Sequence, residues 1–410
     1  MSKIQKYRAE ILIIGGGAAG LTLSLLLGNA GVKVHLVEPF PPKALRDTAI
    51  SSRTVAMMQS SINILQAAGQ ESFCDEHGTI MEVMRIIDDS MAGQDNVTSE
   101  FDSFDIGLPY FSMNIPNDLL RAKMYEDASV HKNITIHNMK LEDYTVDDVN
   151  VSARLEDGIE IITPLIIGAD GRESLVRKIA GIKAKKTQYG QSAITCIINH
   201  SRGHENTSTE FHREGGPFAL VPMTGNQSSV VWVENTEKAD ALLKLSRDAF
   251  EESLQKATND ILGGITLETN PQSWPLCAIK AKDITAPRVA LIAEAAHVMS
   301  PITAQGLNLS LRDVAALAET VVDHLRIGSD IGAKVVLREY ERRRAFDIDT
   351  RTFGVDAMNR IVRHKNAPVK DARRIGLKAL NKFSPLKIIA MQHGLAPSLD
   401  QGRLVRGETL

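Results

Sequence analysis

A glycine-rich segment near the start of the chain has the residue types and spacing of a phosphate-binding turn. It reads Gly15-Gly16-Gly17-Ala18-Ala19-Gly20. In such a GxGxxG turn, Gly15 permits the tight turn, Gly17 lets the backbone approach a pyrophosphate, and Gly20 lets helix and strand pack closely. The N-terminus of the following helix offers N–H groups and the positive end of its dipole to phosphates. The segment predicts dinucleotide binding; a glycine-rich turn without a ligand is the alternative.

An acidic residue follows at the distance this interpretation requires. Glu38 ends the second apolar run of the chain, 18 residues after Gly20. A carboxylate at that point accepts hydrogen bonds from a ribose 2′-hydroxyl and disfavours a 2′-phosphate. The predicted ligand is therefore FAD or NAD rather than NADP.

Two later segments have the same order of apolar run, turn and helix start. Residues 166–174 place Asp170 and Gly171 after a buried strand, with Ser174 as a candidate helix cap. By itself this Asp is equally compatible with a solvated turn. Residues 288–308 place Glu294 at the carboxyl end of another buried strand, before a Pro/Gly loop and a new helix. An acid and loop amides at that position suit a ligand with both a polyol and a polar ring edge.

The elements that must position these residues follow from hydrophobic periodicity. Residues 9–14 are apolar except for Glu10, and residues 18–30 are rich in Ala and Leu. Residues 33–38 predict a second strand, so the chain is expected to begin with a βαβ unit. Short alternating runs at 134–167 and 186–235 predict further strands, and residues 239–257 predict a helix. Residues 310–325 and the chain from 335 to about 391 are helical in pattern. The apolar stretch 11–27 is interrupted by glycines, so we do not interpret it as a signal peptide or membrane span.

Composition sets limits on the function. The 410 residues are 43% hydrophobic and 24% charged, which excludes disordered, collagen-like and disulfide-scaffold classes. Three widely spaced cysteines predict neither a disulfide framework nor a metal site. The net charge of −3 argues against a nucleic-acid partner.

The three segments, in this order, resemble the single-component FAD aromatic hydroxylases of the para-hydroxybenzoate hydroxylase type. Within that family the chain is most similar to the ubiquinone-biosynthesis hydroxylases that act on polyprenylated phenols. The resemblance covers nearly the whole chain. Further stretches that support it are 53–57, 117–121, 216–222, 231–232, 274–276 and 340–344.

The resemblance implies an α/β fold: a Rossmann-like FAD-binding domain, a β-sheet substrate domain and a helical C-terminal region. We expect the discontinuous FAD-binding domain at 1–72, 107–183 and 279–345, the β-rich substrate domain at 73–106 and 184–278, and the helical region at 346–410.

The resemblance also implies which residues contact the cofactor. Gly15, Gly17 and Gly20 would hold the pyrophosphate and Glu38 the adenosine ribose. Arg53, Asn117 and Arg121 would lie along the phosphates and ribityl chain, Asp170 would support the cofactor, and Glu294 would bind ribityl hydroxyls. Pro301 would lie beside the reacting ring, and Gly306, Leu307 and Asn308 would line the isoalloxazine. Alternatively, Arg53 and Arg121 are surface residues that form ion pairs, and Asn117 is a helix cap.

The chain departs from the family pattern at two places. The usual Gly-Asp is Ala293-Glu294, and the usual Gly-Gln-Gly is Ala304-Gln305-Gly306. The glutamate keeps the acceptor chemistry with one more methylene, so we expect FAD to be retained. His297, just after the strand, is expected to stabilise a local turn rather than to act as an acid or base.

The mechanism implied by the resemblance needs no indispensable protein nucleophile and no metal. NAD(P)H would dock transiently, reduce FAD and leave, and a flavin C4a-hydroperoxide formed with dioxygen would hydroxylate the ring. Alternatives are a hydroxylase of another aromatic, a same-fold flavin reductase or halogenase, and a catalytically silent FAD-binding scaffold of a biosynthetic complex.

The end of the chain is basic. From Ile361 onward there are ten Lys and Arg against three acids, a balance of +7. The excess is compatible with a solvated tail, or with contact to an anionic membrane surface or to other pathway enzymes. We expect a cytoplasmic protein, with peripheral association at the inner membrane as the second option.

Overall fold

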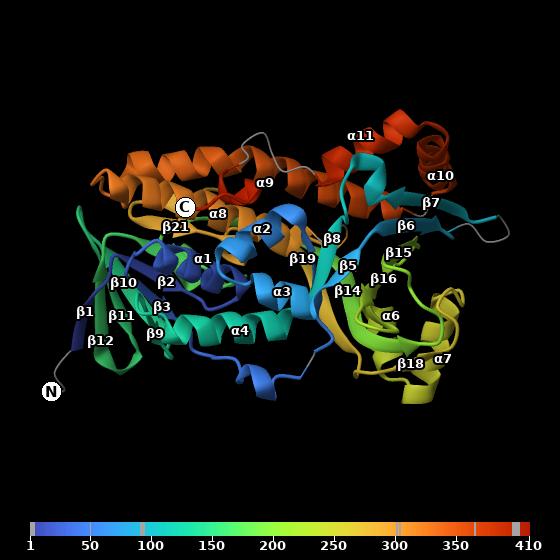
Figure 1. Cartoon of the computed structure of the whole chain (residues 1–410), viewed down its shortest axis with the longest axis horizontal. Helices are drawn as coiled ribbons and strands as arrows, with labels where there is room; N and C mark the ends of the chain where they lie inside the picture. Colours follow the sequence, from blue (N-terminus) through green and yellow to red (C-terminus); the bar gives the residue numbers. More distant parts are fainter. Residues whose placement is uncertain are drawn as a thin grey trace.

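The computed structural model describes residues 5–49, 51–90, 95–300, 302, 305–364, 366–395 and 402–410. A six-stranded and a nine-stranded sheet lie toward opposite ends of the molecule (Figure 1). One long helix, α9 (Lys334–Val362), runs along the upper side of the molecule from the end that holds the six-stranded sheet toward α10 and α11. The α/β architecture predicted from the sequence is confirmed.

The six-stranded sheet carries the glycine-rich segment. Its strands, in spatial order, are β20 (Thr285–Ala286), β21 (Val289–Leu291), β13 (Ile166–Gly168), β2 (Ile11–Ile14), β3 (Val34–Val37) and β9 (Ile134–His137). From β21 to β9 every pairing is parallel. Strands β2, β3 and β13 are apolar at nearly every position because parallel strands in such a sheet are covered on both faces.

Two smaller sheets flank this one. The four-stranded sheet is ordered β1 (Gln5–Arg8), β12 (Ile159–Thr163), β11 (Val151–Leu155) and β10 (Leu141–Val146). The three-stranded sheet is ordered β4 (Thr54–Met58), β8 (Ser112–Pro116) and β5 (Thr79–Met81). Five helices come from the N-terminal half of the chain, as these sheets mostly do. They are α1 (Ala18–Asn29), α2 (Gln59–Ala67), α3 (Glu71–His77), α4 (Asn117–Val130) and α5 (Leu175–Ile179).

The nine-stranded sheet joins two distant parts of the sequence. Its order is β22 (His297–Val298), β19 (Gln272–Ala281), β14 (Ala184–His200), β17 (Gln227–Asn235), β16 (Pro217–Met223), β15 (Thr207–His212), β6 (Val83–Asp88) and β7 (Val97–Asp102), with β18 (Ile265–Leu267) on β14. One face is covered by α6 (Thr236–Leu243) and α7 (Arg247–Ala257). The single helix predicted over 239–257 is wrong, because the Ser246 hydroxyl accepts the Ala249 N–H and starts a new helix.

The remaining helices cover the top of the molecule. They are α8 (Gln305–Arg326), α9, α10 (Ala367–Lys382) and α11 (Ser384–Leu395). The expected domain limit at residue 345 falls inside α9, which continues without a break. Residues 402–410 return to the first half of the chain, where the Val405 carbonyl accepts a hydrogen bond from Asn63. Among the described helices, none is long and apolar enough to cross a membrane.

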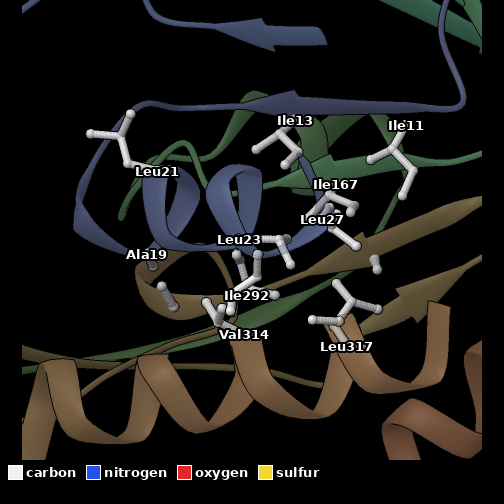
Figure 2. Close-up of a cluster of buried hydrophobic side chains, with 14 of the residues drawn as sticks. Ile11, Ile13, Ala19, Leu21, Leu23, Leu27, Ile167, Ile292, Val314 and Leu317 are labelled. Carbon is white, nitrogen blue, oxygen red and sulfur yellow. The ribbon is translucent and has the colours of Figure 1, made fainter. Parts of the chain in front are cut away.

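The largest hydrophobic cluster lies between α1, the six-stranded sheet and α8. Figure 2 shows Leu23 of α1 beside Ile292, with Val314 and Leu317 of α8 next to them. Because α1 is buried between sheet and helix, nearly all of its residues are apolar or small. This packing holds the glycine-rich turn at one end of α1.

Two buried histidines in the six-stranded sheet predict that the free energy of unfolding decreases in acid. His35 Nδ1 lies 2.9 Å from His137 Nε2, and the Tyr7 ring contacts both imidazoles edge-on. Burial, and then the proximity of His137, lowers the pKa of His35 to about 4. Burial also lowers the pKa of His137. An unfolded histidine, with a pKa of about 6.5, binds a proton at higher pH than either folded one.

The free energy of unfolding should therefore be highest above about pH 6.5 and should fall as the pH drops toward 4. Urea unfolding at several pH values measures this slope. We expect His35→Gln to flatten it between these limits, whereas substitution of the exposed His364 by Gln should leave it unchanged. Equal slopes for wild type and H35Q would contradict the prediction.

Candidate functional site

Three loops meet at the carboxyl edge of the six-stranded sheet. They follow β2, β13 and β21, which are adjacent and parallel. The Ala169 N–H donates to the Ile14 carbonyl at 2.8 Å, and the Ile292 N–H donates to the Gly168 carbonyl at 3.0 Å. The three segments singled out in the sequence are thus side by side, at the edge where ligands bind in open parallel sheets.

The glycines of the first loop are required for different reasons. Gly15 has a φ of +111°, and a Cβ on it would lie 2.3 Å from the Ala169 carbonyl oxygen. A Cβ on Gly20 would lie 1.9 Å from the Gly15 carbonyl oxygen. By contrast, within the described part of the chain no atom beyond the two neighbouring residues lies within 4 Å of a Cβ placed on Gly17. Gly15 and Gly20 are therefore needed for packing, whereas Gly17 borders open space.

Glu38 lies directly beneath this loop. Its Oε2 accepts the Gly16 N–H and its Oε1 accepts the Phe40 N–H, both at 2.7 Å. The Arg121 guanidinium donates to the Gly16 carbonyl at 2.9 Å and to the Phe40 carbonyl at 2.7 Å. Glu38 and Arg121 thus join the loop to the end of β3. The sequence analysis assigned no role to Gly16, although a Cβ there would lie 2.9 Å from Glu38 Cβ.

The loop geometry fits a bound dinucleotide. Helix α1 begins after Gly17 with no side-chain cap and no acid in its first turn, so the positive end of its dipole is not neutralised there. Asp170 accepts the Leu175 and Val176 N–H groups through Oδ2, while its buried Oδ1 has no hydrogen-bond partner. An uncapped helix start fits a pyrophosphate, and an orphan carboxylate oxygen fits a hydroxyl donor.

Arg53 and Asn117 are neighbours, but Arg53 extends toward the other sheet. The Asn117 N–H donates to the Arg53 carbonyl at 3.1 Å, and Asn117 is the first residue of α4. The Arg53 guanidinium lies 4.7 Å from the centroid of the Trp274 ring in β19. The indole N–H of Trp274 in turn donates to Thr195 of β14. This contact joins the cofactor half to the nine-stranded sheet.

Glu294 lies in a short turn after β21. Its carboxylate accepts hydrogen bonds from the Arg172 guanidinium at 3.1–3.2 Å, and its side chain is 46% exposed. Arg172 follows Asp170, so this ion pair joins the second and third loops. The preceding residue, Ala293, has a φ of +55°, a left-handed conformation that costs a non-glycine residue about 1–2 kcal/mol.

The start of α8 holds the last group of predicted residues. Pro301 lies outside the described residues. Gly306 is exposed in the first turn of α8, and Leu307 is partly buried. Asn308 is fully buried: its Oδ1 accepts the Met58 N–H and its Nδ2 donates to the Ala56 carbonyl, both at 2.8 Å. Asn308 therefore fastens β4 to α8.

A buried charge network beneath the third loop was missed by the sequence analysis. Asp313 Oδ2 lies 2.6 Å from His297 Nε2, and Asp313 Oδ1 accepts from Arg344 Nε at 2.7 Å. Arg344 and Arg312 both donate to Asp347, at 2.9 and 2.8 Å. The spacing of Arg344 and Asp347, three residues apart in α9, is the one signal that the sequence offered for part of this network.

The protonation states follow from these contacts. Burial by itself raises the pKa of Asp313, but His297 and Arg344 outweigh it, and the pKa is lowered. Burial lowers the pKa of Arg312 to about 10. The sequence analysis expected His297 to stabilise a local turn, whereas its Nε2 lies against Asp313 of α8.

The nine-stranded sheet turns a second apolar face away from α6 and α7. Ile194, Cys196 and Ile198 of β14 pack under those helices, and alternation places Ala193 on the opposite face. The residues that cluster there are Tyr189, Ala193, Val231, Val233, Leu276 and Ala278. The described residues contain no group of three His, Cys, Asp or Glu that could hold a metal ion.

Comparison with known proteins agrees with this geometry. The family model described as "FAD binding domain" matches residues 8–346. The chain is 33% identical over 407 residues to the ubiquinone hydroxylase UbiL of Rhodospirillum rubrum, covering 98% of this chain and 94% of the relative. It is 26% identical over 398 residues to the 3-demethoxyubiquinol 3-hydroxylase of Escherichia coli, covering 94% and 98%.

Solved structures share the fold. The p-nitrophenol 4-monooxygenase PnpA from Pseudomonas putida superposes with a TM-score of 0.78 at 17% identity, covering 97% of this chain and all of that one.

Proposed function

The chain belongs to the FAD-binding-domain family and is a FAD-dependent monooxygenase, and from that premise we propose that it hydroxylates the aromatic ring of a polyprenylated phenol in ubiquinone biosynthesis. The observation that carries the proposal is the meeting of three cofactor loops at one sheet edge, joined to an apolar sheet by Arg53 and Trp274. The printed names of two relatives, a ubiquinone hydroxylase and a 3-demethoxyubiquinol 3-hydroxylase, support the substrate class.

The FAD-binding residues act by orientation. The amides after Gly17 and the positive end of the α1 dipole would face the pyrophosphate. Glu38 and Arg121 hold the loop, and Glu38 would face the adenosine ribose. Asn117 and Arg121 would lie along the phosphates and ribityl chain, whereas the Arg53 guanidinium extends to Trp274. Asp170, through its unpartnered Oδ1, and Glu294 would accept hydrogen bonds from cofactor hydroxyls. Gly306 and Leu307, at the start of α8, would lie on the flavin side, and Asn308, whose side chain is bonded to β4, would hold this helix start in place.

The substrate side of the site requires an apolar surface that fits the ring and excludes water, rather than a reactive side chain. The apolar face around Val231, Val233 and Leu276 excludes water and accepts the ring and prenyl tail. When bound, FAD that has taken two electrons from NAD(P)H supplies activated dioxygen to the ring. No protein nucleophile takes part.

The proposal is tested on the purified holoenzyme with a short-chain prenylphenol, NADH or NADPH, and ¹⁸O₂. One labelled oxygen atom should enter the ring as a hydroxyl, the other should leave as water, and the phenol should stimulate NAD(P)H oxidation. para-Hydroxybenzoate without a prenyl tail is the matched control and should stimulate oxidation less.

Other outcomes identify the alternatives. Turnover without oxygen would indicate a flavin reductase, and halide-dependent turnover would indicate a halogenase. Stimulation by an unprenylated aromatic alone would indicate another hydroxylase. Bound FAD with no stimulated oxidation by any phenol would indicate a scaffold.

We propose an anionic membrane surface as the partner of the C-terminal helices. Lys378 and Lys382 are exposed on α10, beside the exposed apolar Ile375 and Phe383. Cationic and apolar side chains together favour anionic bilayers. In a flotation assay with anionic and neutral vesicles, Lys378→Glu/Lys382→Glu should lose selective binding to the anionic ones, whereas Lys334→Glu on α9 should not. Equal binding of anionic and neutral vesicles by the wild type would contradict this proposal and favour contact with other pathway enzymes. Unchanged selective binding by the double variant would contradict the assignment to α10.

A further inference from the structure

Helix α9 contacts both the third cofactor loop and the nine-stranded sheet. Near its N-terminus, the buried Tyr340 hydroxyl donates to the Leu291 carbonyl, the last of β21, at 2.8 Å. Near its C-terminus, Asn359 donates to the Gln191 side chain at 3.2 Å, and Arg363 donates to the Tyr189 carbonyl at 3.0 Å. One continuous helix therefore ties the strand that leads into the Ala293–Glu294 turn to β14.

The same helix reaches the turn a second time through two side chains. Arg344 donates to Asp313 Oδ1 at 2.7 Å, and Asp313 Oδ2 accepts the Ala293 N–H at 3.0 Å. The side chains of Arg344 and Asp313 are 3% and 0% exposed. Water does not weaken these contacts, so their geometry is closely defined.

The residue at the end of this chain of contacts is held in an unfavourable conformation. Ala293 has a φ of +55° and a Cβ, so its backbone resists the conformation that directs Glu294 toward Arg172. Such conformations persist where the surroundings over-determine them. Here the restraints are the Asp313 carboxylate on the Ala293 N–H and the Ala296 N–H on the Ala293 carbonyl, at 2.9 Å.

We propose that Asp313 and Arg344 are positioning residues that hold Ala293 in its left-handed conformation and thereby place the Glu294 carboxylate for FAD. Helix α9 contacts the nine-stranded sheet at one end and β21 at the other, so it links the position of that sheet to the backbone conformation of the cofactor turn. The inference rests on the proposed FAD site, and it concerns how this chain tolerates alanine at a backbone position that glycine adopts freely.

A merely structural role predicts a different result. If Asp313 only stabilised the α8–α9 interface, changing Ala293 would not alter the effect of changing Asp313. If Asp313 acts by restraining Ala293, glycine at 293 removes the need for the restraint. The two substitutions must then be coupled.

The experiment measures FAD dissociation constants and thermal midpoints for the apoprotein forms of wild type, Asp313→Asn, Ala293→Gly and the double variant. We expect D313N to weaken FAD binding about tenfold. A293G alone should stay within about threefold of wild type, and the double variant should recover most of the loss. In hydrogen exchange, the Ala293 amide should lose protection in D313N.

Arg343→Gln is the matched control. Arg343 joins α9 to Glu319 of α8 by a comparable partly buried ion pair, away from the turn. R343Q should lower the thermal midpoint without weakening FAD binding, and A293G should not rescue it. If D313N does not fold, Arg344→Lys keeps the charge, loses the fork geometry, and should show a smaller loss that A293G also rescues.

Additive effects of D313N and A293G, or an equal loss of FAD binding in R343Q, would overturn the inference. These outcomes are separate from a failure of the proposed function. A wild type that binds FAD but hydroxylates no prenylphenol leaves the coupling measurable, whereas a wild type that binds no FAD contradicts the cofactor site itself.

Discussion

Replacing Gly17 by alanine is expected to weaken FAD binding by about tenfold to a hundredfold while leaving the fold intact. Among the described residues, apart from its two neighbours in the chain, the added methyl group would meet no atom within 4 Å. The Gly17 backbone has a φ of −76° and a ψ of 177°, an extended conformation that any residue adopts without strain. The methyl group would instead occupy the space through which the α1 amides approach a diphosphate, and charge-assisted hydrogen bonds would be lost.

The measurement is a FAD titration of the apoprotein followed by flavin fluorescence, together with urea unfolding without FAD. The free energy of unfolding should change by less than about 1 kcal/mol. Gly354→Ala, in α9, is the matched control because its Cβ also meets nothing within 4 Å. It should stabilise the helix by about 0.5–1 kcal/mol and leave FAD binding unchanged. An unaltered FAD affinity in G17A would contradict the prediction that the pyrophosphate binds at this loop.

Gly20→Ala does not make the same test. Its Cβ would overlap the Gly15 carbonyl, so loss of FAD would follow from loss of the loop itself. The comparison of Gly17 with Gly20 thus separates a glycine needed by the ligand from one needed by the fold.

Replacing Arg373 by methionine is expected to destabilise the docking of α10 by about 3–5 kcal/mol, because it leaves the carboxylate of Asp88 buried and unpaired. Asp88 in β6 is fully buried, and Arg373 donates to it at 2.6 Å. Burial by itself raises the pKa of Asp88, but the hydrogen bonds from Arg373 and Ser90 outweigh it, so the pKa is lowered. The carboxylate therefore stays charged and depends on its partner.

Limited proteolysis and urea unfolding detect this change. R373M should be cleaved within residues 366–395 at a protease concentration that leaves wild type intact, since α10 can open locally. Lys378→Met, on the exposed side of the same helix, is the control and should behave as wild type. Asp88→Asn/R373M should be more stable than R373M, because neither charge is left alone. Equal protease resistance of R373M and K378M would contradict the prediction.

The basic C-terminal region shows why charge counts in a sequence do not locate partners. The balance of +7 from residue 361 onward suggested a solvated tail or an external acidic surface. In the structure, Lys370, Arg373, Lys387 and Arg403 pair with Glu214, Asp88, Asp105 and Asp323. Most of the excess therefore docks α10, α11 and the last segment on the rest of the chain.

The nucleotide loops were determined by the sequence itself. The first two depend on neighbouring residues: a run of apolar side chains that forms a buried strand, a glycine at a turn with positive φ (Gly15 or Gly171), and a helix start. The third has the same buried strand, but its residue with positive φ is Ala293. These local preferences placed β2, α1, β13 and β21 and the residues Gly15, Asp170 and Glu294 at one sheet edge. The parallel pairing that brings the loops together follows from the alternation of strands and helices.

Only the tertiary structure decided which side chains restrain those loops. Glu38 accepts the Gly16 N–H, and Asn308 accepts the Met58 N–H of β4. Asp313 accepts the Ala293 N–H and is itself held by a hydrogen bond from Arg344. Asp88 meets Arg373 across 285 positions of sequence. Such contacts leave no periodic signal, because a buried charge selects its partner by where the folded backbone brings the two groups. Backbone conformation is encoded by near neighbours, whereas the partners of buried polar groups are set by the path of the whole chain.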